Sequence, residues 1–123
     1  LKPIATDDAP AALGPYSQGI DTGGLVFVSG QLGVDPKTGE MPETTAEQAT
    51  LVMKNIAAAL AQAGCTYDNV AKTTIFLADI NDFSAVNEIY GACFTKTKPA
   101  RSTFQVAALP KGAKVEIEVI AVK

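Results

Sequence analysis

Apolar residues recur at helical spacing in two stretches of the chain. In the first, Thr44 and Glu47 have the spacing of a capping box, and an apolar series then runs to Gly64, a typical helix stop: Ala49, Val52, Met53, Ile56, Leu60 and Ala63. The second series follows the potential cap residues Asn81 and Asp82 and contains Phe83, Val86, Tyr90, Cys93 and Phe94. The pattern predicts a helix over about 45–63 and a shorter helix that ends before Lys96.

Four other stretches are rich in β-branched and aromatic residues, which is typical of strands: 25–29, 70–77, 102–106 and 114–122. The order of strands, helix, strand, helix and strands predicts an α+β two-layer sandwich, with two helices on one face of a mixed sheet. We expect the two helical crossovers to make parallel strand pairings and residues 35–39 to form a turn. Because 123 residues is the size of one domain, residues 1–123 are expected to fold as a single domain.

The last predicted strand has two different faces. One set of side chains is apolar and the other is mixed, and they alternate along the strand: Val115, Ile117, Val119 and Ala121 against Glu116, Glu118, Ile120 and Val122. We expect the apolar set to face the helices. Since two helices cover only one side of the sheet, the half-apolar second face indicates self-association.

Composition places the chain among folded, soluble proteins, because 47% of its residues are hydrophobic and 19% are charged. No apolar run approaches the roughly 18 residues of a membrane span, and no signal or transit peptide is recognised, so a cytoplasmic location is expected. The formal net charge of -3 argues against general nucleic-acid binding, which requires a basic surface that neutralises phosphates. A small molecule or another protein is the favoured partner.

The residue types that are missing narrow the chemistry. The chain has no histidine, and its two cysteines, Cys65 and Cys93, form no CxxC pair. Zinc and most transition-metal sites are hard to build from this inventory, so a metal is not expected. Ser-His-Asp and Cys-His catalysis are excluded as well. Proton transfer is left to carboxylates, lysines, tyrosines and positioned water.

Two charged residues are the main candidates for a site. Arg101 follows a proline turn in the segment KPARSTFQ, where its planar guanidinium is suited to bind a carboxylate through two hydrogen bonds. A surface ion pair is the alternative interpretation of a single arginine at a strand start. Glu116 lies in the middle of a predicted strand, with Glu118 on the same face, so the pair indicates either a base with a raised pKa or a solvated strand face.

Other candidates are weaker on their own. Gly14-Pro15-Tyr16 and Ser29-Gly30-Gln31 place a glycine beside polar or aromatic residues at strand boundaries, which permits either close approach of a ligand or an ordinary turn. Asn87 lies one step off the apolar stripe of the second helix, as a surface residue also would.

Several ordered motifs together resemble the RidA/YjgF family: IATDDAPAALGPYSQG, VSGQLGVDPKTGE, VAKTTIFLADINDFSAVNEIY and KPARSTFQVAALPKGAKVEIEVIAV. They cover almost the whole chain. The resemblance implies a chorismate-mutase-like fold and a homotrimer with a central barrel and three clefts between subunits. It also implies a hydrolytic deaminase that needs no cofactor and converts 2-iminobutanoate and 2-iminopropanoate to 2-oxo acids and ammonia.

The resemblance also implies roles for individual residues. Arg101 corresponds to the arginine that binds the substrate carboxylate, and Glu116 to the glutamate that positions or activates water. Substrate-binding positions carry over to Tyr16, Ser29, Gly30 and Asn87. Two positions depart from other members: Thr103 stands where some have cysteine, leaving its backbone N–H as the expected substrate contact, and Lys98 stands where an aromatic residue is frequent, which is expected to affect substrate range.

Two other function classes remain as alternatives. Some members of the family are described as translation inhibitors, ribonucleases or chaperone-like proteins, and a trimer that binds 2-oxo acids without useful turnover is a further possibility. The acidic charge and the few aromatic residues argue against a nucleic-acid role, since only Lys96, Lys98 and Arg101 form a basic cluster.

Overall fold

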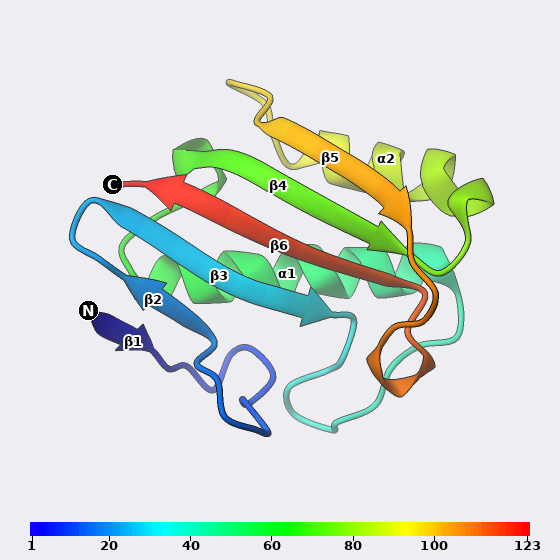
Figure 1. Cartoon of the computed structure of the whole chain (residues 1–123), viewed down its shortest axis with the longest axis horizontal. Coiled ribbons are helices and arrows are strands. Elements are labelled where there is room, and N and C mark those ends of the chain that lie inside the picture. Colours follow the sequence, from blue (N-terminus) through cyan, green and yellow to red (C-terminus); the bar gives the residue numbers. More distant parts are fainter.

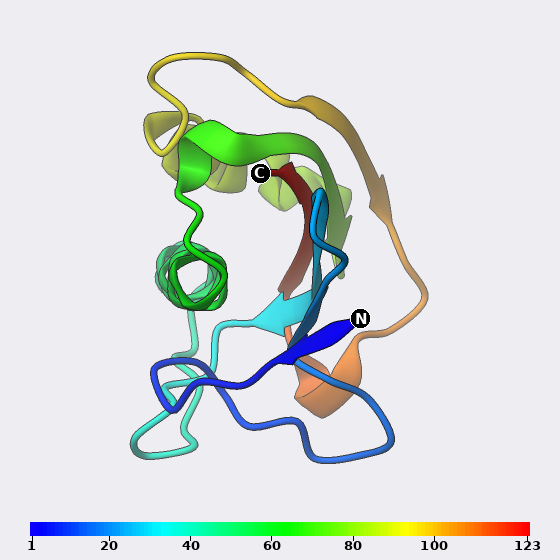
Figure 2. The same ribbon diagram turned by 90° about the vertical axis from the view of Figure 1, so that its left-hand side faces the viewer.

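The computed structural model describes residues 1–123 and contains one six-stranded sheet with two helices packed on one side of it (Figure 1). The strands are β1 (Lys2–Ile4), β2 (Gly19–Asp21), β3 (Leu25–Leu32), β4 (Val70–Leu77), β5 (Ala100–Gln105) and β6 (Val115–Val122). The helices are α1 (Thr45–Gln62) and α2 (Phe83–Ala92). Figure 2 shows both helices on the same side of the curved sheet, so the predicted α+β architecture of two layers is confirmed.

Both predicted helices are present, with small differences at their ends. The hydroxyl oxygen of Thr44 accepts a hydrogen bond from the backbone N–H of Glu47 at 3.2 Å, which is the expected cap of α1. At α2 the expected caps are wrong, because Asp82 makes no side-chain cap bond. Asp79 instead caps a short 3₁₀ turn (Ile80–Asp82) that leads into α2.

The sheet order is β1-β2-β3-β6-β4-β5, which corrects one expectation. The crossover through α2 makes the parallel pair β4–β5, as predicted. The crossover through α1 makes no direct pair, because β6 lies between β3 and β4 and is antiparallel to both. With one fully apolar face, β6 is suited to this central place. The strands β1 and β2 were not predicted, since three residues are too few to show alternation.

The core lies between the sheet and the helices. The four side chains of β6 that were expected to face the helices, Val115, Ile117, Val119 and Ala121, are at most 2% exposed. The opposite face of the sheet carries large apolar side chains that are 41–48% exposed, namely Phe27, Phe104 and Val122. The predicted division of β6 into a buried face and a half-apolar open face is therefore confirmed.

Candidate functional site

A cavity of about 770 Å³ lies where the segment before β2 meets the end of β3, the turn before β6 and the open face of β6. Four of the residues predicted from the sequence line it: Tyr16, Ser29, Gly30 and Glu116. They come from three separate parts of the chain, so the fold brings four of the seven predicted site residues together.

A bulge in β3 determines how Gly30 and Glu116 lie. Val28 pairs with Val119 and Gln31 pairs with Ile117, so β3 has one residue more than β6 over this stretch. At this bulge Gly30 lies against the Glu116 side chain: a Cβ atom added to Gly30 would be 2.8 Å from Cδ of Glu116 and would overlap its Oε2. Glycine is therefore required here for close contact between backbone and carboxylate.

Gln18 fixes the segment that carries Tyr16. Its buried side-chain amide donates to the carbonyl oxygens of Thr6, Ala9 and Pro10 and accepts from the backbone N–H of Thr6. Ser29 joins the same segment, since its hydroxyl donates to the carbonyl of Ser17 and its N–H donates to the carbonyl of Gln18. Sequence reasoning missed this role of Gln18, because a single glutamine before a short strand gives no periodic signal.

Burial, followed by the charge of nearby Glu118, raises the pKa of the Glu116 carboxyl above its usual value. Neither glutamate forms an ion pair within the chain. Lys111 also lines the cavity, and its φ of 58° makes it the one residue other than glycine with a positive φ. A half-buried carboxylate beside a cavity is suited to accept a proton from water.

The remaining predicted residues lie together at the β5 edge, beside α2. Nη1 of Arg101 donates to Oδ1 of Asn87 at 2.5 Å. The guanidinium carbon is 5.2 Å from the ring centroid of Phe83 and 5.2 Å from that of Tyr90. No carboxylate lies within ion-pair distance of Arg101, so the surface ion pair considered for it is not observed.

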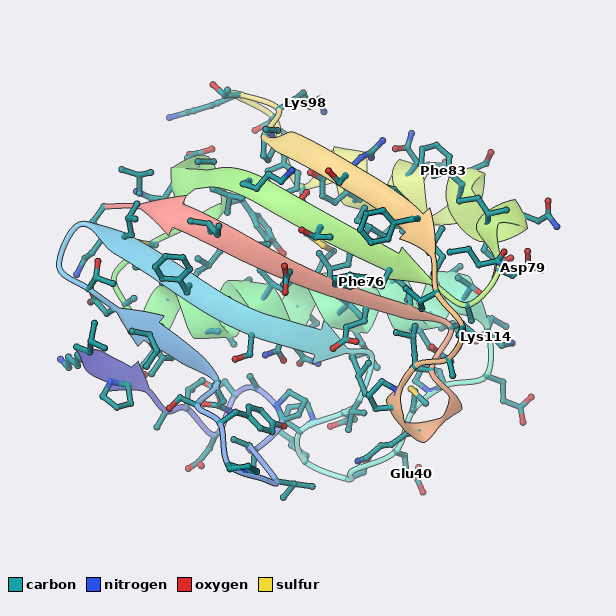
Figure 3. All side chains as sticks on the ribbon, in the orientation of Figure 1. Glu40, Phe76, Asp79, Phe83, Lys98 and Lys114 are labelled. Atoms are coloured by element: carbon teal, nitrogen blue, oxygen red, sulfur yellow. The ribbon has the colours of Figure 1, made fainter.

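Thr103 and Lys98 flank Arg101. Thr103 shares its face of β5, and the Thr103 hydroxyl is buried without a hydrogen-bond partner. The Lys98 ammonium donates to the carbonyl oxygens of Gly91 at 2.9 Å and Phe94 at 2.8 Å, at the end of α2 (Figure 3). Its positive charge therefore stabilises the carboxyl end of α2. An effect of Lys98 on substrate range stays a prediction.

The two groups of residues lie on opposite faces of the sheet. On β4, Thr73 pairs with Arg101 and points with the buried side chains toward the helices, whereas Phe76 pairs with Glu116 on the open face. The Arg101 and Glu116 side chains of one chain therefore do not face a common cavity. The structure brings together Tyr16, Ser29, Gly30 and Glu116 in one place and Asn87, Arg101 and Thr103 in another.

No three Cys, Asp or Glu side chains are arranged so that they could hold a metal ion. Neither helix has the length and apolar character that crossing a membrane requires.

Comparison with known proteins gives full-length matches. The family model described as endoribonuclease L-PSP matches residues 6–123. A Mus musculus protein named 2-iminobutanoate/2-iminopropanoate deaminase is 50% identical over 123 residues, which cover 99% of this chain and 91% of the mouse protein. The crystal structure of Escherichia coli TdcF with bound serine is 47% identical with a TM-score of 0.97, and that of the E. coli YjgF gene product is 50% identical with a TM-score of 0.97; both matches cover 100% of this chain and 99% of the other.

Proposed function

The chain belongs to the RidA/YjgF family, and from this premise we propose that it is a hydrolytic deaminase that converts 2-iminobutanoate and 2-iminopropanoate to 2-oxo acids and ammonia. Relatives from mouse and E. coli, each 50% identical to this chain, carry the name of this activity. The observation that carries the proposal is the half-buried Glu116 carboxylate, held against Gly30 beside a cavity with its pKa raised.

The reaction requires a carboxylate anchor and a proton carrier. The water oxygen forms a bond to C2 of the imine, while Glu116 accepts a proton from that water and the electron pair of the C=N bond moves to nitrogen. Glu116 then returns the proton to nitrogen, which gives a carbinolamine. Glu116 next carries the proton of the new hydroxyl group to the amino nitrogen, the C–N bond breaks as the C=O bond forms, and the 2-oxo acid and ammonia are released. Chemistry of this kind uses neither a metal ion nor a covalent nucleophile.

Arg101 is proposed to bind the substrate carboxylate. Nη1 donates to Asn87, and the Arg101 side chain makes no other hydrogen bond, so Nε and Nη2 remain as two donors that can meet both carboxylate oxygens. Tyr16, Ser29 and Gly30 are proposed to line the substrate position next to Glu116, and the backbone N–H of Thr103 to contact the substrate beside Arg101.

Because Arg101 and Glu116 lie on opposite faces of the sheet, we propose that the site forms between subunits of a homotrimer. The exposed Phe27, Phe104 and Val122 on the open face supply apolar area for such an assembly. In this arrangement Arg101 of one subunit and Glu116 of the next contact the same substrate. The serine bound to TdcF is a small amino acid, which agrees with a small-molecule ligand.

A ribonuclease activity is the alternative that the name of the family model suggests. The three cations that form the basic cluster are all engaged: Lys96 lies 3.6 Å from Asp68, Lys98 donates to two carbonyls, and Arg101 donates to Asn87. Of the three, Arg101 alone keeps two donors without a partner, and one such cation in a chain of net charge -3 attracts phosphates weakly, so imine hydrolysis is the better-supported function.

The deciding experiment removes the charge of Glu116 and keeps its shape. Glu116→Gln is expected to lower kcat by about 10² to 10⁴, the usual contribution of a general acid-base group, while 2-oxobutanoate still binds. Ammonia release coupled to threonine dehydratase measures the first effect, and titration calorimetry measures the second. Glu118→Gln is the matched control and is expected to keep turnover at neutral pH. Normal turnover by Glu116→Gln would refute the role of Glu116, and a wild-type protein without imine hydrolysis would refute the function.

A further inference from the structure

One face of α2 presents three side chains to the guanidinium of Arg101. Phe83, Asn87 and Tyr90 are spaced at i, i+4 and i+7, so they follow one another along the same side of the helix. Figure 3 labels Phe83 on α2, next to β5. Asn87 supplies one hydrogen bond, and the two rings supply the surfaces on which the rest of the guanidinium lies.

We propose that Phe83 and Tyr90 are positioning residues that hold the Arg101 guanidinium ready for the substrate carboxylate, which is an inference that rests on the proposed function. An arginine side chain has several rotatable bonds, and ordering it when substrate binds weakens binding. Cation–π contacts with two rings restrict the guanidinium before the substrate arrives. These contacts leave the Nε and Nη2 donors free, whereas a hydrogen-bonding residue in place of a ring would occupy one of them.

Tyr90 is itself fixed by buried contacts. Its hydroxyl forms a 2.8 Å hydrogen bond with the hydroxyl of Thr73, and its ring packs at 4.8 Å between centroids against Phe94. Thr73 is also the residue of β4 that pairs with Arg101 in the sheet. The Tyr90 ring and the backbone of Arg101 are therefore both held to β4, so their relative position depends little on motion at the surface.

Because rings surround the guanidinium, no carboxylate of the chain competes with the substrate for it. No carboxylate of the chain contacts Arg101, although the protein contains 13 acidic residues. A neighbouring Asp or Glu would occupy the two donors that the substrate carboxylate needs. Orientation by rings instead keeps the guanidinium ordered and without an anionic partner.

The kinetic test compares ring removal with ring retention. Phe83→Leu and Tyr90→Leu are each expected to raise KM for the imine and Kd for 2-oxobutanoate by about 3- to 30-fold, the range that one cation–π contact corresponds to. kcat is expected to change much less, because Glu116 is untouched. Tyr90→Phe keeps the ring and is expected to bind within about 2-fold of wild type, even though it loses the bond to Thr73.

Val86→Ala is the matched structural control. Val86 lies on the same helix and is 1% exposed in the core, so its truncation loosens the packing of α2 without removing a ring from Arg101. This variant is expected to lower thermal stability while KM and Kd stay near their wild-type values. The proposal is overturned if Val86→Ala raises KM as much as the ring variants do, if folded Leu variants bind as wild type, or if Tyr90→Phe behaves like Tyr90→Leu.

A second readout does not depend on substrate. Arg101 is the only arginine in the chain, so the arginine Nε–H group gives a single NMR signal in ligand-free protein without an arginine-containing tag. Ring currents from Phe83 and Tyr90 are expected to move that signal away from the position of a solvated arginine, and Phe83→Leu is expected to move it back. An unshifted wild-type signal overturns the proposal. If the signal behaves as expected but wild-type protein neither binds 2-oxobutanoate nor hydrolyses the imine, the proposed function fails while the positioning by the rings stands.

Discussion

At the scale of single residues, the contact between Gly30 and Glu116 decides where the carboxylate lies. The alternation of residues in the last strand was sufficient to predict that Glu116 and Glu118 share the face away from the helices. It could not predict that Glu116 is the half-buried one, because its burial depends on the bulge in β3 and on loops distant in sequence. Local pattern gives the direction of a strand side chain, whereas its depth comes from tertiary contacts.

The pH dependence of hydrolysis follows from the surroundings of the same carboxylate. The pKa of Glu116 is raised first by burial and then by Glu118, so the deprotonated base forms only at a higher pH than for an ordinary glutamate. We therefore expect kcat/KM to fall as the pH is lowered through this raised pKa. Glu118→Gln removes one raising cause and is expected to move the midpoint of this acid limb to lower pH.

A pH profile of kcat/KM from direct ammonia determination checks this prediction. Glu116→Gln is the control, since it lacks the titrating base and is expected to lose the acid limb. A midpoint that stays in place or moves upward in Glu118→Gln would contradict the coupling between the two carboxylates.

At the scale of elements, sequence pattern located both helices and the four longer strands to within a few residues. Both helices and the strands β3, β4 and β6 bury one face in the core, whereas β5 was located by its β-branched and aromatic residues. Pairing was harder to predict. The insertion of β6 between β3 and β4 joins segments far apart in the chain, and no local signal in 25–32 or 70–77 encodes it. The short strands β1 and β2 depend on hydrogen bonds to β3 and to each other rather than on a pattern of their own.

The end of α2 depends on Lys98. Its ammonium donates to the carbonyl oxygen of Gly91 in the last turn of α2 and to that of Phe94 just beyond it, where the helix supplies few backbone N–H groups. Lys98→Met keeps most of the aliphatic stem and removes both bonds. Because the side chain is exposed, we expect a loss of only about 1 kcal/mol in the free energy of unfolding, or about 4 °C in Tm.

Thermal denaturation by circular dichroism measures the effect of Lys98. Lys37→Met is the matched control, since Lys37 is also exposed and its ammonium donates to no carbonyl. An equal change in Tm for both variants would show that the loss of a surface charge, and not of the helix cap, lowers the stability.

At the scale of the whole molecule, the predicted site residues form two groups, and one chain holds them apart. Sequence motifs nominated seven residues, and the structure gathers four of them around the cavity and three beside α2. Their separation follows from parity: Arg101 pairs with Thr73 and Glu116 with Phe76, and residues an odd number apart on β4 point to opposite faces. This relation depends on the register of β5 and β6 against β4. The sequence of each strand alone therefore could not predict that Arg101 and Glu116 point to opposite faces.

The proposed assembly predicts that two inactive variants restore each other. Arg101→Lys is expected to lower kcat/KM by about 10² because lysine cannot form the two parallel hydrogen bonds, and Glu116→Gln removes the base. If each site takes Arg101 from one subunit and Glu116 from its neighbour, random mixed trimers contain wild-type sites at interfaces where each chain contributes its unaltered residue. In every trimer that contains both kinds of chain, this holds for one site in about three.

Coexpression of the two variants with different tags, followed by tandem purification and light scattering, isolates mixed trimers for the ammonia assay. Arg101→Lys chains carrying both tags are the control and are expected to stay inactive. Recovery to about one third of wild-type activity follows only if the two residues act across an interface, because sites built within one chain always contain one altered residue. Mixed trimers without recovered activity would therefore contradict the shared site, and a monomeric mass would contradict the assembly on which it depends.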